Sequence, residues 1–131
     1  MIRILGRARK QSRIKAADLT EDEDSMQMAL IELLEYQARP GWIWKHSPNE
    51  GKRSPREGAK QKKKGLCPGW PDLDLISPEG IWHGLELKTP RGVLTPAQRD
   101  FGAEADRLGL RYRVAWGWDN AITCLKEWGA L

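Results

Sequence analysis

Two carboxylates and a lysine stand at a spacing that favours metal-assisted chemistry. The dipeptide Pro71-Asp72 is followed, after thirteen residues, by the tripeptide Glu86-Leu87-Lys88. Two neighbouring strands joined by a tight turn would bring Asp72 and Glu86 together on one face of a sheet. Close carboxylates repel unless a cation lies between them, so the pair predicts a site for Mg²⁺ or Mn²⁺. Lys88 on the same face, and the Leu87 carbonyl, would complete a site for phosphodiester hydrolysis.

A surface hairpin is the competing interpretation of these residues. Alternating Glu-x-Lys is common in strands, where the two charges often form an exposed ion pair of little energetic value. Asp74 would share the face of Asp72 and could replace it as a ligand if the register shifted by one pleat. Asp72 is preferred because it follows a proline at the strand entrance.

The surrounding segments predict one α/β domain with a central mixed sheet flanked by helices. Apolar alternation predicts four strands, at residues 42–47, 72–76, 81–89 and 111–116. Apolar side chains at three- and four-residue spacing predict three helices, at about 21–38, 96–108 and 120–128. Residues 48–69 are interpreted as a loop with, at most, a short helix around 57–64.

Capping residues indicate where the helices begin. Thr20 and Glu23 fit a capping box for the first helix, and Thr95 and Gln98 fit one for the helix after Lys88. Asp119 is expected to cap the last helix.

Seven tryptophans are many for a chain of this length. We expect Trp116, and either Trp42 or Trp44, to lie in the core. Trp70 and Trp82 flank the predicted site and could stack on an unpaired base.

Positive charge is concentrated in two parts of this 131-residue chain of net charge +4. Residues 1–15 hold six basic and no acidic side chains, and residues 52–64 hold seven basic side chains and one acidic. Such clusters favour a polyanionic partner, because each neutralised phosphate releases condensed counterions. A solvated tail and a solvated loop are the alternative. Residues 1–18 are interpreted as a basic arm, and residues 19–131 as the catalytic domain.

Composition excludes several classes of protein. No apolar run approaches the roughly 20 residues of a membrane-spanning helix, and the first residues do not resemble a secretory signal. The two cysteines, Cys67 and Cys124, are too few for a disulfide framework or a four-cysteine zinc site, and neither is expected to be catalytic. We therefore expect a reducing, cytoplasmic setting; that the cell is bacterial or phage-infected is an expectation that composition does not supply.

Three motifs in this order resemble the VRR-NUC domain, the virus-type replication-repair nuclease of the PD-(D/E)xK superfamily of restriction-like endonucleases. They are Gly65-x-x-x-Gly69-x-Pro71-Asp72, Gly84-Leu85-Glu86-Leu87-Lys88 and Gly92-x-Leu-Thr-x-x-Gln98. The resemblance also takes in His46-x-x-Asn49-Glu50-Gly51 and Glu23-x-x-x-Gln27, so it covers roughly residues 21–128. It implies a restriction-endonuclease-like fold and a magnesium-dependent (or manganese-dependent) DNA endonuclease.

The resemblance also implies roles for single residues. Asp72 and Glu86 match the metal-binding carboxylates, and Leu87 matches the residue whose carbonyl joins them. Lys88 matches the catalytic lysine. Gln98 matches a glutamine near the active site, and we expect this role to alternate with its capping of Thr95, since one side chain serves both.

A glutamate of the first helix completes the metal sphere in the resembled family. Glu23 fits best, because it stands four residues before Gln27. Glu32 and Glu35 lie on the same helix and stay open as alternatives. A capping role with Thr20 is the competing interpretation of Glu23.

Contacts to the DNA backbone are expected from one amide and seven basic side chains. These are Asn49, Lys52, Arg53, Lys60, Lys62, Lys63, Lys64 and Arg91. No residue set is suited to reading base edges, so selectivity for branched DNA such as Holliday junctions is expected. A homodimer is expected as well, because resolving a junction needs paired cuts and stand-alone members of the resembled family act as dimers. A non-catalytic nucleic-acid-binding module is the alternative function.

Overall fold

Residues 22–47 and 54–131 are described by the structure, a computed structural model of the chain. Its elements are α1 (Glu23–Gln37), β1 (Ile43–His46), α2 (Pro55–Lys63), β2 (Leu73–Ile76), β3 (Trp82–Lys88), α3 (Pro96–Leu108), β4 (Arg111–Trp116) and α4 (Trp118–Trp128). The predicted basic arm, Thr20, Asn49, Lys52 and Arg53 lie outside the described residues. No helix of the described part is long and apolar enough to cross a bilayer.

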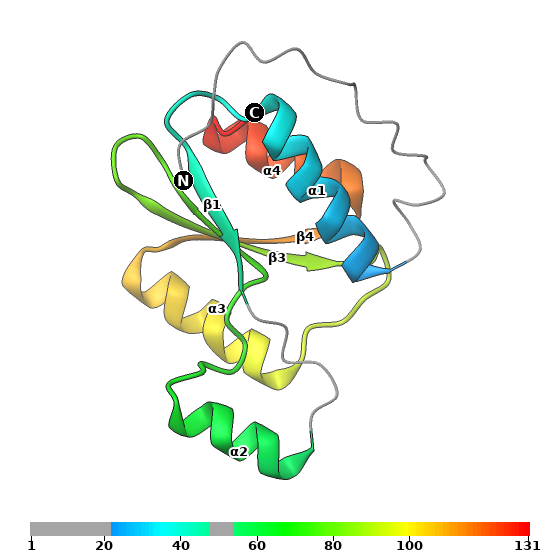
Figure 1. Ribbon diagram of the computed structural model, residues 1–131, viewed down its shortest axis with the longest axis vertical. Helices are drawn as coiled ribbons and strands as arrows, with labels where there is room; N and C mark the ends of the chain where they lie inside the picture. The colour runs from blue at the N-terminus through cyan, green and yellow to red at the C-terminus, as the bar shows by residue number, and fades with distance from the viewer. Residues whose placement is uncertain (1–21, 48–53) are drawn as a thin grey trace.

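The four strands form one sheet in the order β1-β2-β3-β4. The first two pairs are antiparallel, and β3 pairs with β4 in parallel through the α3 crossover. Figure 1 shows α1 and α4 on one side of the sheet and α3 on the other. The predicted α/β class, with a mixed sheet flanked by helices, is confirmed.

The core lies between the sheet and the helices α1 and α4. Its largest side chains come from alternate strand positions and from one face of each helix, and at most 1% of their surface is exposed. They are Met26, Leu30 and Leu34 of α1, Leu73, Leu75, Leu85 and Leu87 of the strands, and Leu125 of α4. Burying each of these leucines stabilises the fold by roughly 2 kcal/mol. This packing fixes the register of β2 on β3, and therefore fixes where the polar ends of both strands lie.

The other face of the sheet is covered by α3. Phe101 of this helix packs edge-on against Tyr112 of β4, with ring centroids 5.2 Å apart, and lies 6.5 Å from the Trp82 ring of β3. Glu86 and Lys88 alternate with buried leucines along β3, so they project from this second face.

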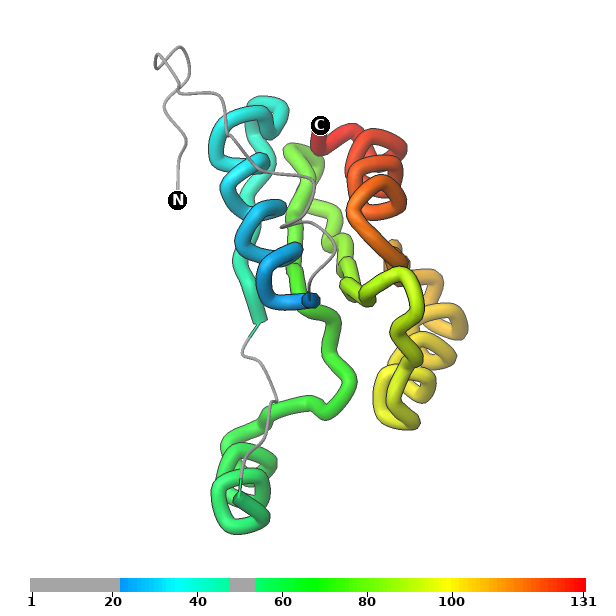
Figure 2. Tube along the Cα trace, turned by 90° about the vertical axis from the view of Figure 1, so that its right-hand side faces the viewer, coloured from blue at the N-terminus to red at the C-terminus, as the bar shows by residue number. Residues whose placement is uncertain are grey.

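Helix α2 is longer and begins earlier than the short helix allowed at 57–64. Ser54 caps it by accepting a hydrogen bond from the Glu57 N–H group, and Pro55 occupies the first turn. None of residues 55–63 is buried. Figure 2 shows α2 standing apart from the sheet, at the end opposite α1 and α4.

Two predicted caps are wrong. Asp22 caps α1 by accepting a 2.6 Å hydrogen bond from the Ser25 N–H group, so Glu23 is the first helical residue and is not placed for a capping box with Thr20. Gly117 occupies the cap of α4, with no side-chain capping bond among the described residues, and Asp119 lies inside the first turn. Acidic side chains are also favourable there, because the helix N-terminus carries partial positive charge.

Candidate active site

The β2–β3 hairpin brings Asp72 and Glu86 together. Leu73 pairs with Leu85, so Asp72, which directly precedes β2, lies opposite Glu86 at the end of the ladder. Asp72 Oδ2 accepts a 2.7 Å hydrogen bond from the Leu87 N–H group, which holds its carboxylate against β3. The juxtaposition that the spacing predicts is therefore present.

Glu86 is a buried carboxyl group, with 1% of its surface exposed. Burial, followed by the hydrogen bond and the negative charge of Asp72, raises the pKa of Glu86 to about 9, and the positive charge of Lys88 only partly opposes this. Glu86 is consequently protonated at neutral pH. Its Oε1 atom is buried and has no hydrogen-bond partner among the described residues.

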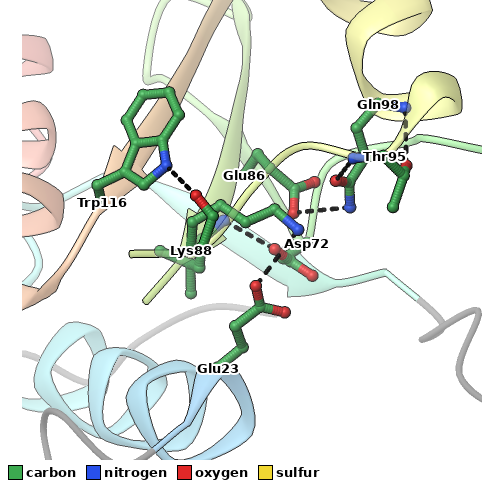
Figure 3. A network of polar contacts seen from close by, with 9 residues as sticks. Glu23, Asp72, Glu86, Lys88, Thr95, Gln98 and Trp116 are labelled. Carbon is green, nitrogen blue, oxygen red and sulfur yellow. Dashed lines mark hydrogen bonds and ion pairs between the residues drawn. The ribbon is translucent and has the colours of Figure 1, made fainter. Parts of the chain in front are cut away.

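Lys88 is also buried, and its Nζ atom lies 3.3 Å from Glu23 Oε1. Figure 3 shows Glu23 reaching from the start of α1 toward this ammonium group. Glu32 and Glu35 lie nine and twelve residues further along the same helix, roughly 14 and 18 Å away at 1.5 Å per residue. Of the three candidate glutamates, the fold brings Glu23 to the site.

Gln98 makes both of its expected contacts at once. Its Oε1 accepts from the Thr95 N–H group at 2.9 Å, and its Nε2 donates to Glu86 Oε2 at 3.3 Å (Figure 3). The expectation that capping and contact with the active site alternate is wrong, because the carbonyl oxygen and the NH₂ group of the one side-chain amide bind different partners. The capping box thereby fixes the rotamer of a side chain that reaches the carboxylate pair.

Asp74 is engaged in holding the fold. Its Oδ1 accepts hydrogen bonds from the indole N–H groups of Trp70 and Trp82, each at 2.8 Å, and its Oδ2 accepts from the Ser47 hydroxyl at 2.5 Å. Lys45 lies 3.7 Å from the same Oδ2 atom. With both oxygens in use, Asp74 does not take the place of Asp72, and the register shift is absent. The residues alone gave no signal of this cluster.

The two tryptophans beside Asp74 belong to an aromatic cluster. Their rings lie 5.7 Å apart, and Phe101 packs against both. Their N–H groups donate to Asp74, which fixes both rings beside it. Stacking of either ring on an unpaired base stays a prediction.

Two β4 side chains were not assigned to the site from the sequence. Tyr112 has a buried hydroxyl group without a hydrogen-bond partner in the described part of the chain. Burial, and then the charges of Glu86 and Asp72, raise the pKa of Tyr112. Trp116, expected in the core, is 43% exposed and pairs in register with Lys88. Alternation along β4 could have shown that both share the face of Glu86, but not that Trp116 is exposed.

Other predicted residues are placed around this centre. His46 Nδ1 lies 2.6 Å from Gln27 Nε2, which joins the end of β1 to α1. Arg91 is exposed in the connection after β3. Cys67 is exposed and Cys124 is buried, and both are free thiols.

Two carboxylates are the candidate donors for a metal ion. Across residues 22–47 and 54–131, no group of three or more His, Cys, Asp or Glu side chains is arranged to hold one. Asp72 and Glu86 alone do fit a divalent cation, because it would partner the orphaned Glu86 Oε1 and offset both the burial and the Asp72 charge that raise the pKa of Glu86. Leu87 touches this pair through its N–H group. Its carbonyl as a ligand stays a prediction.

Similarity to known proteins is found among solved structures. No protein-family model and no curated protein matches the chain. A solved structure described as "VRR_NUC domain protein" matches it with a TM-score of 0.65 and 27% identity, over 82% of this chain and 87% of that chain. A second, "VRR_NUC domain", has a TM-score of 0.54 and 21% identity over 80% and 94% of the two chains, and supports the fold alone. The chain is thus a structural match to VRR-NUC domain proteins, which implies a nuclease.

Proposed function

We propose that this protein is a divalent-metal-dependent DNA endonuclease that is selective for branched DNA such as Holliday junctions. The observation that carries the proposal is the Asp72–Glu86 pair, in which Glu86 is buried with one oxygen unpartnered and the buried Lys88 lies at the same strand end. A surface hairpin would leave these charges in water, whereas burial of Glu86 and Lys88 beside the half-buried Asp72 is expensive and typical of a functional site.

The residues divide the chemistry between them. Asp72 and Glu86 would hold the cation, and the carbonyl of Leu87 would add a further oxygen. When bound, the cation neutralises phosphate charge and lowers the pKa of the attacking water. Gln98 fixes Glu86 through Oε2, which leaves Oε1 available for the ion. Binding the ion also requires Glu86 to release its proton, so cation affinity rises with pH.

Lys88 stabilises the negative charge that develops on the phosphate during the reaction. Its position is set by Glu23, whose carboxylate lies 3.3 Å from Nζ and balances the buried positive charge. In this arrangement Glu23 positions Lys88 and is not free to bind a metal ion. Service as a third metal ligand, which the family resemblance implies, requires Glu23 to leave Lys88.

The DNA backbone is held by exposed basic side chains. Lys60, Lys62 and Lys63 of α2 and its C-cap residue Lys64 project from a helix with no buried residue, and Arg91 follows the site directly. Asn49, Lys52 and Arg53 are proposed to join them, although they lie outside the described residues. Contacts of this type position DNA without reading its sequence, which supports selectivity for DNA structure.

A homodimer in the cytoplasm is proposed for the working form, since paired cuts need two sites. Trp42 and the buried apolar side chains of α1 belong to the core and are not available as a dimer surface. Exposed apolar side chains are found instead at one end of the sheet, where Ile43 pairs with Ile76 and Ile81 precedes β3. These three residues are the proposed contact region.

The test is cleavage of supercoiled plasmid, a four-way junction, a flap and a linear duplex in Mg²⁺, Mn²⁺ or EDTA. Wild type is compared with Asp72→Asn and with Asp100→Asn, a control on the exposed surface of α3. We expect metal-dependent cutting, preferentially of the junction, that Asp72→Asn abolishes and Asp100→Asn retains. Tight DNA binding without cleavage in either metal would identify the chain as a binding module. Light scattering at micromolar concentration tests the dimer.

A further inference from the structure

Two exposed apolar side chains lie at the edge of the proposed site. Val93 is 75% exposed in the connection formed by residues 89–94, here called the rim loop, which directly follows Lys88. Trp116, at the end of β4, is 43% exposed. Single exposed apolar residues are ordinary on protein surfaces. These two differ because the Trp116 indole is hydrogen-bonded to Gly92, the residue before Val93, and Trp116 pairs in register with Lys88.

The rim loop is held in place by the residues around it. The Gly92 N–H group donates to the Thr89 carbonyl at 2.9 Å, which closes a tight turn. The Gly92 carbonyl accepts a 2.9 Å hydrogen bond from the indole Nε1 of Trp116. The Leu94 carbonyl accepts from Arg99 Nη1 of α3 at 3.4 Å. The residues on both sides of Val93, Gly92 and Leu94, are therefore held by hydrogen bonds, which fixes the position of Val93.

The indole lies next to the proposed catalytic lysine. Trp116 is the register partner of Lys88 on the parallel β3–β4 ladder, and Figure 3 shows its side chain on the Lys88 side of the carboxylate pair. A nucleotide whose phosphate reaches Lys88 would consequently bring its base, or the neighbouring base, over this edge.

The chemistry offered here suits a nucleobase. The only indole N–H group of Trp116 is used by Gly92, so the exposed part of the side chain offers a ring surface and no hydrogen-bond donor. Val93 adds an apolar side chain. Arg91 is the only charged residue of the rim loop, and its positive, exposed side chain complements a phosphate of the same strand. Apolar ring contact beside positive charge is typical of proteins that stack unpaired bases.

We propose that Trp116 and Val93 form a stacking surface for one unpaired or unstacked base beside the scissile phosphate. The inference rests on the proposed nuclease function and deepens it, because it gives the site a preference for DNA with unpaired bases. Base-paired duplex offers no exposed base face there and gains nothing from the surface.

The test measures binding in Ca²⁺ to two oligonucleotides of one sequence, a perfect duplex and a duplex with a three-nucleotide bulge. A 2-aminopurine in the bulge reports stacking through fluorescence quenching. We expect Trp116→Ala to weaken binding of the bulge by about 5- to 100-fold and to remove the quenching, with duplex affinity unchanged within about twofold. Trp116→Phe keeps an aromatic face but loses the bond to Gly92, and it should retain most of the affinity and the quenching.

Two further variants complete the design. Val93→Ser alters the surface without touching the core, and should reduce affinity for the bulge selectively, by less than Trp116→Ala. Leu108→Ala, 59% exposed at the far end of α3, is the matched control and should resemble wild type. The proposal is overturned if bulge and duplex lose affinity equally, if neither Trp116→Ala nor Val93→Ser weakens the bulge, or if Trp116→Phe is as weak as Trp116→Ala. Dissociation of a dimer by Trp116→Ala would identify a protein interface and overturn it too.

The experiments distinguish failure of the nuclease proposal from failure of the stacking proposal. Wild type that binds the bulge through Trp116 but cuts nothing in Mg²⁺ or Mn²⁺ leaves the stacking surface standing without catalysis. Wild type that cuts DNA while Trp116→Ala binds the bulge normally leaves the nuclease standing without the stacking surface.

Discussion

Replacing Glu86 by glutamine should stabilise the cation-free protein, increasingly so as the pH rises. The pKa of this buried carboxyl is raised from 4.5 to about 9, so between these values the folded chain binds a proton that the unfolded chain has released. The free energy of unfolding then falls as pH rises, by up to about 1.4 kcal/mol per pH unit. Glutamine is neutral throughout and carries no such dependence.

The size of the effect follows from the difference between the pH and 4.5. The free energy of unfolding of wild type should be lower than that of Glu86→Gln by under about 1 kcal/mol at pH 5, about 3 kcal/mol at pH 7 and about 5 kcal/mol at pH 8. Glutamine has nearly the shape of a protonated glutamic acid. It still accepts from Gln98, and its amide N–H group can donate to Asp72.

Urea denaturation in EDTA at pH 5 to 8, followed by tryptophan fluorescence, measures these differences. Asp100→Asn, an exposed carboxylate on α3, is the control and should follow wild type at every pH. Added Mn²⁺ should then stabilise wild type and not Glu86→Gln, because binding to the folded state alone raises the free energy of unfolding. Parallel pH curves for wild type and Glu86→Gln would refute the reasoning, since Glu86 would then titrate like an exposed carboxyl.

Three further predictions concern the lysine, the loop before Asp72 and the basic helix. Lys88→Ala should lower the maximal cleavage rate by roughly two to four powers of ten and leave DNA affinity in Ca²⁺ almost unchanged; an equal loss in affinity would make Lys88 a phosphate anchor. Gly69→Ala should lower both the melting temperature and the cleavage rate. Gly69 has φ +81°, and a Cβ atom there would lie 2.2 Å from the Ala97 carbonyl oxygen, in the helix turn that carries Gln98. Gly58→Ala, with open space around it, is the control. Neutralising the lysines at 62–64 should reduce the log–log salt slope of duplex binding by about 0.9 per lost phosphate contact, and an unchanged slope would mean that α2 does not touch DNA.

The sequence by itself determined the elements that position the site. Alternation on both sides of a short turn sets the β2–β3 register, because a shift by one residue would turn the leucines of the shifted strand away from the core. The juxtaposition of Asp72 with Glu86 follows from that register. The capping box of Thr95 and Gln98 is local as well, since both partners stand within one helical turn. These parts of the fold depend on neighbours in the chain, and neighbours are visible in the sequence.

Tertiary structure alone decided which distant residues complete the site. Three glutamates of α1 were open candidates, and only the angle at which the helix crosses the sheet brings Glu23 to Lys88, 65 positions away. Alternation along β4 could place Trp116 on the face of Glu86, but only the packing of the elements around it decided that it is 43% exposed and not in the core. Asp74 was the alternative to Asp72 on the same face, and only the folded chain shows its carboxylate engaged by Trp70 and Trp82. Contacts of this kind depend on how whole elements pack, and that packing results from the summed burial of many side chains rather than from any local pattern.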